Sequence, residues 1–196
     1  MTSICLVRHG ETDWNKQGRL QGKTDIPLNS HGRQQAKECQ QYLKGTEWDV
    51  LITSPLSRAK KTAEIINEEL QLPLVEMEEF IERTFGEAEG MTAEERRTAF
   101  ADTDYPGKET IEALNQRVLA GIEKIKETYP QKKVLLVAHG AVIGAILSYF
   151  SYGETDAGKE KLLNACISNI DYQQERWNIR DYNQVSHLSA YREKAN

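Results

Sequence analysis

Two histidines and two arginines stand out in this chain of 196 residues. They occur in the segments Arg8-His9-Gly10, Ser57-Arg58 and His139-Gly140, which lie far apart in the sequence. The planar guanidinium of arginine binds phosphate oxygens through paired hydrogen bonds and keeps its charge. An imidazole can act as a nucleophile, an acid or a base. If the fold brings these side chains together, they can bind a phosphoryl group and accept it covalently.

Each of these segments follows or closely follows a short apolar run that is typical of a buried parallel strand. The runs are Ile4 to Val7, Val50 to Ile52 and Val134 to Ala138, and none alternates with polar residues, as expected for strands covered on both faces. The carboxyl ends of parallel strands meet at one edge of the sheet, where open α/β folds bind ligands. We therefore expect His9 and His139 to share one pocket with both arginines, beside helix N-termini that favour an anion.

Segments with helical periodicity lie between and after these strands. The apolar spacing predicts helices over four ranges: 31–44, about 54–70, 109–129 and 141–150. The first is expected to begin at Asn29 or Ser30 and to bury Tyr42. Ser54 is expected to cap the second helix and Pro55 to open it.

Strands that alternate with helices of this length predict an α/β fold, a three-layer α/β/α sandwich around a mostly parallel sheet. Residues 165–172 and 176–182 are predicted to add a late strand pair. The acidic stretch 73–107 breaks the alternation and is predicted to be a lid-like excursion that covers the pocket, with a capping box at Thr92-Ala-Glu-Glu95. No linker divides the chain, so residues 1–196 are expected to form a single domain.

Composition excludes several classes of protein. The chain has 25 Lys and Arg against 30 Asp and Glu, a net charge of −5, which argues against a nucleic-acid partner. No apolar run approaches the ~18 residues of a membrane span, and the N-terminus does not resemble a signal peptide. The three cysteines are far apart, which excludes a disulfide scaffold and a cysteine zinc site. We therefore expect a cytoplasmic protein without a membrane or nucleic-acid partner.

The segment around the first histidine resembles the signature of a known family. Leu6-Val7-Arg8-His9-Gly10-Glu11-Thr12-Asp13-Trp14-Asn15 is similar to the motif of the histidine phosphatase superfamily, the phosphoglycerate-mutase-like enzymes. The resemblance runs nearly end to end, through residues 18–22, 54–59, 137–140 and 177–188. It implies the phosphoglycerate-mutase-like fold and a phosphatase, a phosphoric monoester hydrolase that uses no metal and no other cofactor. Its substrate would be a small organic phosphomonoester.

The resemblance also implies a role for individual residues. His9 would be the nucleophile and form a phosphohistidine through Nε2, and Glu82 would donate a proton to the leaving oxygen. The phosphoryl group would be bound by the following residues: Arg8, Arg58, His139, Asn15 and the backbone N–H of Gly140.

Some of these assignments compete with plainer ones. Asn15 could instead cap a turn, and Gln21 could contact the substrate or be an ordinary loop residue. Glu79 and Glu87 are rivals of Glu82 as the acid, since all three lie in an acidic run.

Two positions depart from the pattern of the family. Ala88 stands where many phosphatase members have tryptophan, and Lys108 replaces a common glycine. Neither change removes a group that the chemistry requires.

Two other functions remain as alternatives. A phosphoglycerate mutase would use the same His9, but mutases of the family carry a longer insert between the acid and the second histidine, so the chain length favours hydrolysis. A catalytically idle phosphate-binding module would be expected to lack a reacting group, and none is missing here.

Overall fold

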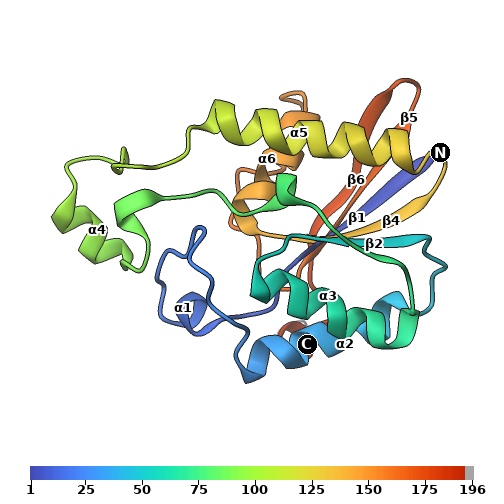
Figure 1. Ribbon diagram of the computed structural model, residues 1–196, viewed down its shortest axis with the longest axis horizontal. Helices are drawn as coiled ribbons and strands as arrows, with labels where there is room; N and C mark the ends of the chain where they lie inside the picture. Colours follow the sequence, from blue (N-terminus) through green and yellow to red (C-terminus); the bar gives the residue numbers. More distant parts are fainter. Residues whose placement is uncertain (193–196) are drawn as a thin grey trace.

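A computed structural model, which describes residues 1–192, has the expected three-layer α/β/α architecture (Figure 1). Helices α2 (Ser30–Leu43) and α3 (Ser57–Leu70) cover one face of a six-stranded sheet. Helices α5 (Ile111–Thr128) and α6 (Gly140–Phe150) cover the other face. The predicted fold class is therefore confirmed.

The sheet is parallel in its centre and antiparallel at one side. Its strands are arranged in the order β3-β2-β4-β1-β5-β6, and β5 and β6 run antiparallel to their neighbours. The strand bounds are β1 Thr2–Arg8, β2 Val50–Thr53, β3 Leu74–Glu76, β4 Lys133–Ala138, β5 Ile167–Gln173 and β6 Arg176–Gln184. The late pair of strands is thus confirmed.

The central strand β4 shows why the predicted strands lack polar residues. Its side chains alternate between two hydrophobic cores: Val134 and Leu136 pack toward α5 and α6, whereas Leu135 and Val137 pack toward α2 and α3. All four are fully buried. A strand that contributes to a core on each face must be apolar over its buried length, which in β4 is Val134 to Ala138.

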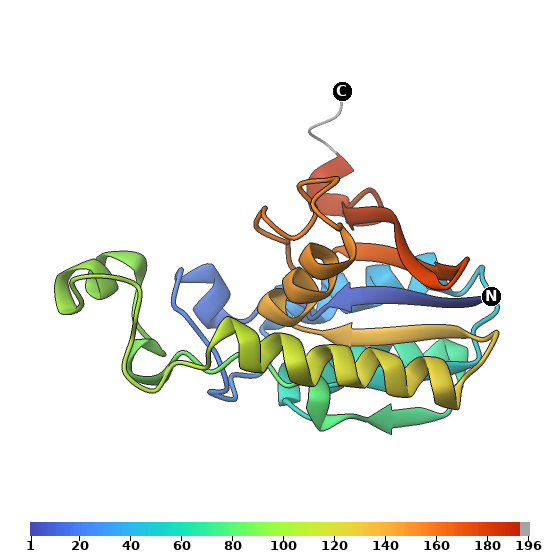
Figure 2. The same cartoon turned by 90° about the horizontal axis from the view of Figure 1, so that it is seen from above.

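The stretch 73–107 differs in part from the expectation. Its first residues form β3, an edge strand with exposed Leu74 and Glu76, and such a strand carries no buried apolar run that sequence reasoning could detect. The predicted capping box is confirmed at the start of α4 (Ala93–Ala99). Figure 2 shows α4 on an arm that extends beyond the carboxyl edge of the central strands, on the side where α1 (Asp13–Lys16) lies.

The predicted start of the second helix is wrong. Helix α3 begins at Ser57, and neither Ser54 nor Pro55 belongs to it. The carboxylate of Asp25 accepts hydrogen bonds from the backbone N–H (2.9 Å) and the hydroxyl (2.7 Å) of Ser57. A side chain from a distant loop therefore provides the cap that the local sequence was expected to provide.

The first helix begins as predicted, but one of its side chains does not lie where expected. Asn29 is the N-cap of α2 and accepts a hydrogen bond from the backbone N–H of Gly32 (2.8 Å). Tyr42 was expected in the buried stripe, yet 56% of its surface is exposed. It is turned about 100° around the helix from the buried Leu43, which places it at the edge of the apolar face.

No helix within residues 1–192 is both long enough and apolar enough to cross a membrane. All three cysteines are buried and free of disulfide bonds.

Candidate active site

The register of the sheet brings the three strand ends together. Arg8 of β1 pairs with Ala138 of β4, and Thr53 of β2 pairs with Val137 of β4. His9 and His139 follow directly, and their ring centroids are 5.2 Å apart. The predicted convergence of the two histidines at the carboxyl edge is therefore present in the structure.

The imidazole of His9 is held in a single tautomer. Its Nδ1 lies 2.7 Å from the carbonyl oxygen of Gly10, which can only accept, so Nδ1 carries the proton and Nε2 keeps its lone pair. The side chain is buried. Burial, and then the charges of Arg58 and Arg8, hold the pKa of His9 well below its ordinary value. His9 is therefore a neutral imidazole with a free Nε2 at neutral pH.

The backbone after His9 is clamped between α2 and α3. A Cβ atom on Gly10 would lie 2.3 Å from the carbonyl oxygen of Gly32, so only glycine fits where this loop meets α2. The N–H of Gly10 donates to Oγ1 of Thr62 (3.1 Å), and that hydroxyl donates to the carbonyl of Arg58 (2.7 Å). These contacts fix the orientation of His9 relative to Arg58.

Two guanidinium groups lie at the site. The Nη1 and Nη2 atoms of fully buried Arg58 donate to the carbonyl oxygens of Thr24 (2.9 Å) and Gly22 (2.7 Å), and Arg8 donates to Leu162. Burial lowers the pKa of both arginines. The buried Nε atom of each has no hydrogen-bond partner in the described part of the chain. Each guanidinium thus keeps a donor that an anion could satisfy.

His139 connects the arginines to helix α6. It is the N-cap of α6, and its Nε2 lies 2.7 Å from the hydroxyl of Ser54. Burial, followed by the charges of Arg58 and His9, lowers the pKa of His139 well below its ordinary value. Gly140 begins the helix, so its backbone N–H belongs to the first turn, where N–H groups lack intrahelical partners.

The carboxylate of Glu82 also lies at the start of α6. Its Oε2 accepts from the backbone N–H of Ala141 (3.1 Å), its Oε1 accepts from Arg83 (2.8 Å), and the side chain is buried. Its negative charge opposes the lowering of the pKa of Arg8 and of Arg58. Glu82 therefore lies within electrostatic reach of both arginines.

The two rival acids lie elsewhere. Glu79 forms an ion pair with Lys124 at 2.9 Å, and this hydrogen bond is the largest cause of its lowered pKa. Glu87 is exposed to solvent. Of the three candidates, only Glu82 reaches the N-terminus of α6.

Asn15 and Gln21 both hold the turn at Thr12. Asn15 Oδ1 accepts from the backbone N–H of Thr12 (3.2 Å), and the backbone N–H of Asn15 donates to the Thr12 hydroxyl oxygen (3.1 Å), which forms the capping box of α1. Gln21 Oε1 accepts from the same hydroxyl at 2.8 Å. The capping alternative for Asn15 is therefore present, and the amide nitrogens of Asn15 and Gln21 take no part in these bonds.

Sequence reasoning missed Asn164, which connects three parts of the site. Its Nδ2 donates to the carbonyl oxygens of His9 (3.2 Å) and Gly10 (3.4 Å) and to Oδ1 of Asn15 (3.0 Å). It lies between Leu163 and Ala165, and a single polar residue in an apolar segment is the only signal that the sequence offers.

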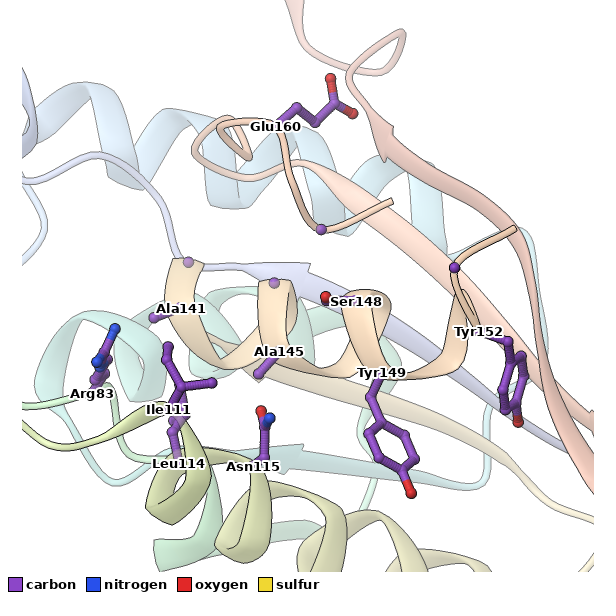
Figure 3. Close-up of a pocket in the computed structure, with 14 residues that line it drawn as sticks. Arg83, Ile111, Leu114, Asn115, Ala141, Ala145, Ser148, Tyr149, Tyr152 and Glu160 are labelled. Atoms are coloured by element: carbon purple, nitrogen blue, oxygen red, sulfur yellow. The ribbon is translucent and has the colours of Figure 1, made fainter. Parts of the chain in front are cut away.

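A groove begins at the edge of the site (Figure 3). Its volume is about 590 Å³, and it extends along α6 from Gly140 and Ala141 toward Tyr149, with α5 on one side and Glu160 on the other. Arg83 lies beside Ala141, at the end of the groove nearest the site, and Ile111 of α5 forms part of the opposite wall.

The two departures from the family pattern belong to the packing of the excursion. Ala88 is fully buried, and the ammonium group of Lys108 lies 5.3 Å from the ring centroid of Tyr105. Within residues 1–192 no group of three or more His, Cys, Asp or Glu side chains could hold a metal ion.

Comparisons with known proteins bear on the family and the fold of the chain. A family model described as the histidine phosphatase superfamily (branch 1) matches residues 4–185. The chain is 55% identical over 191 residues to a Bacillus subtilis (strain 168) protein named uncharacterized phosphatase PhoE, covering 97% of this chain and 99% of that protein. The solved structure of a phosphoserine phosphatase mutant from Entamoeba histolytica, in complex with phosphoserine, matches with a TM-score of 0.82 and 31% identity, covering 96% of this chain and all of that one.

A third comparison concerns the mutase alternative. The chain is 33% identical over 207 residues to the probable phosphoglycerate mutase GpmB of Salmonella choleraesuis (strain SC-B67). The match covers 97% of this chain and 96% of that protein. A relative named as a probable mutase therefore matches this chain nearly end to end, and the expectation that mutases carry a longer insert stays a prediction.

The lowered pKa of His9 predicts how stability changes with pH. As pH falls below about 6.5, histidine in the unfolded chain takes up a proton that folded His9 refuses, so the free energy of unfolding decreases. One such group contributes a slope of up to about 1.4 kcal/mol per pH unit. Urea denaturation between pH 7 and pH 5 should therefore show a shallower decrease for His9→Gln than for the wild type.

His31→Gln is the matched control, because His31 is exposed on α2. Its slope should equal that of the wild type. A His9→Gln variant that loses stability as steeply as the wild type would contradict the burial of a neutral His9.

Proposed function

Because the chain belongs to the histidine phosphatase superfamily, we propose that it hydrolyses small organic phosphomonoesters through a covalent phosphohistidine on His9. The observation that carries the proposal is the 2.7 Å hydrogen bond from His9 Nδ1 to the carbonyl of Gly10. It leaves Nε2 as the free nucleophile in the field of Arg8 and Arg58.

In the first step, Nε2 of His9 attacks phosphorus and the bond to the leaving oxygen breaks. Glu82, in its protonated form, gives its proton to that oxygen, so an alcohol departs. Arg8 and Arg58 hold the phosphoryl oxygens, assisted by His139 and by the backbone N–H groups at the start of α6. Phosphoryl transfer depends mainly on positioning and charge stabilisation, which these preorganised donors supply.

In the second step, a water molecule attacks the phosphohistidine from the side that the alcohol has left. Glu82, now a carboxylate, takes a proton from this water, and His9 Nε2 leaves with its lone pair restored. Inorganic phosphate is released and Glu82 is protonated again. No step needs a metal ion or another cofactor.

Neighbouring features support the binding of a small substrate. The amide nitrogens of Asn15 and Gln21 are available as further donors, and the groove that starts at Gly140 offers room for a leaving group. The three free, buried cysteines are consistent with a reducing cytoplasm. We assign the excursion at 73–107 the role of a lid, since it contributes Glu82 to the site.

A phosphoglycerate mutase is the second candidate, because one relative is named as a probable mutase. It would use the same phosphohistidine but return the phosphoryl group to a glycerate hydroxyl instead of water. A catalytically idle binding module is disfavoured, because every group that the reaction requires is present.

The proposed mechanism predicts turnover of a simple phosphomonoester. The wild type should hydrolyse p-nitrophenyl phosphate, and His9→Ala should reduce kcat by about 10³-fold or more because the nucleophile is lost. His31→Ala, which removes an exposed histidine, should keep wild-type activity. Interconversion of phosphoglycerates that requires a bisphosphate primer would favour the mutase. Absence of turnover with every phosphomonoester tried would exclude the phosphatase.

The proposed mechanism also predicts that Glu82 supplies the proton of the leaving oxygen. Glu82→Gln keeps the size of the side chain and its bond to Ala141 but cannot donate the proton. The kcat/KM, which reports the steps up to departure of the leaving group, should fall by about 10²-fold for alkyl phosphates. For p-nitrophenyl phosphate, whose p-nitrophenolate leaves without a proton, it should stay within about threefold of the wild type. The exposed Glu87→Gln is the control and should affect neither substrate. An equal fall in kcat/KM for both substrates in Glu82→Gln would assign the proton to another group.

A further inference from the structure

Glu89 is an acid of the excursion to which the reaction scheme gives no part, yet it accepts five hydrogen bonds. Its Oε1 accepts from the backbone N–H groups of Lys23 (3.1 Å) and Phe85 (2.9 Å) and from the hydroxyl of Thr84 (3.1 Å). Its Oε2 accepts from the backbone N–H (3.0 Å) and the hydroxyl (2.5 Å) of Thr24. One carboxylate therefore ties residues 23–24 to residues 84–85.

The loop on the first side of Glu89 also carries the acceptors of Arg58. The carbonyl oxygens of Gly22 and Thr24 hold its Nη2 and Nη1 atoms, while the N–H groups of Lys23 and Thr24 point to Glu89. Residues 22–24 thus lie between the carboxylate and the guanidinium and contact both. Any displacement of residues 22–24 would therefore also move the two carbonyl oxygens that accept from Arg58.

Gly22 shows how closely the carboxylate approaches this loop. Its φ of 57° is a left-handed conformation, and a Cβ atom on it would lie 2.0 Å from Oε1 of Glu89. No residue with a side chain fits between the loop and the carboxylate. A side chain at this position would therefore be strained by the backbone conformation and would also displace the carboxylate of Glu89.

The segment on the other side of Glu89 leads directly from Glu82. Thr84 and Phe85 follow that acid after a single residue, Arg83, whose N–H bonds the Glu82 carboxylate at 2.8 Å. Glu89 therefore restrains the chain immediately after the proton donor.

Glu89 is ionised at neutral pH. Burial by itself raises its pKa, but the hydrogen bonds from Thr24, Phe85 and Lys23 outweigh burial and hold the pKa below its ordinary value. Its negative charge also favours the charged form of Arg58.

We propose that Glu89 is a positioning residue that couples Arg58 to Glu82, by fixing the distance between the loop that holds the guanidinium and the segment that follows the acid. The proposal rests on the function proposed above for this site. Glu89 itself touches neither the substrate nor the reacting atoms.

Glu89→Gln tests the coupling with little change in volume. The amide nitrogen of the glutamine replaces one carboxylate oxygen and cannot accept hydrogen bonds. The N–H or O–H donors that faced this oxygen therefore lose their acceptor, and the link between residues 23–24 and residues 84–85 is broken. We expect the inhibition constant of inorganic phosphate and the KM for p-nitrophenyl phosphate to rise about tenfold. The rate ratio of p-nitrophenyl to alkyl phosphates should also rise, because Glu82 is less well placed to donate its proton.

Thr24→Val is a milder second variant, because it removes only the hydrogen bond from the Thr24 hydroxyl to Glu89. It should raise the inhibition constant of phosphate in the same direction, by about threefold. Glu87→Gln, two positions from Glu89 and exposed, removes the same charge and should leave every value unchanged.

The outcomes separate the proposal from the function on which it rests. If the wild type turns over and His9→Ala does not, but Glu89→Gln and Thr24→Val keep the wild-type inhibition constant and leaving-group ratio, the coupling role is wrong and the phosphatase stands. Reduced thermal stability without either kinetic change also overturns the coupling role, because Glu89 is then merely structural. A wild type without turnover overturns the phosphatase itself.

Discussion

Burying the guanidinium of Arg58 without loss of stability is the constraint around which the site is organised. A buried charge is unfavourable unless its N–H groups and its charge are matched by the surroundings. Carbonyl oxygens of residues 22 and 24 match two of its donors, and Asp25 and Glu89 supply nearby negative charge. Burial, and then the charges of Arg58 and Arg8, lower the pKa of His9 and keep it neutral. The Nε atoms of both arginines, which have no partner in the described part of the chain, leave donors for a phosphoryl group.

The parts of this arrangement that depend on local sequence could be predicted. A strand buried on both faces must be apolar throughout, so β1, β2 and β4 are visible in the sequence, and the parallel order then brings His9 and His139 to one edge. Arg58 could be assigned to the same pocket because it closely follows β2. The motif resemblance added Glu82, which periodicity alone does not distinguish from its acidic neighbours.

The parts that depend on tertiary contacts could not be predicted. Nothing near Ser54 reveals that Asp25, from a distant loop, caps α3, or that the hydroxyl of Ser54 instead contacts His139. Asn164 and Glu89 act through backbone groups of segments far away in the sequence, and such acceptors and donors leave no trace in residue types. An acidic run is most simply a solvated surface, which describes Glu87 but not Glu89.

The most direct test of the account is to trap the phosphoryl group on the enzyme. Mixing the wild type with substrate, stopping the reaction in alkali before one turnover is complete, and mapping the added mass by peptide analysis locates the intermediate. The account predicts one acid-labile phosphoryl group on His9, formed before phosphate is released and absent from His9→Ala. Release of phosphate without a phosphoryl group on His9, or with the group on another residue, would contradict it.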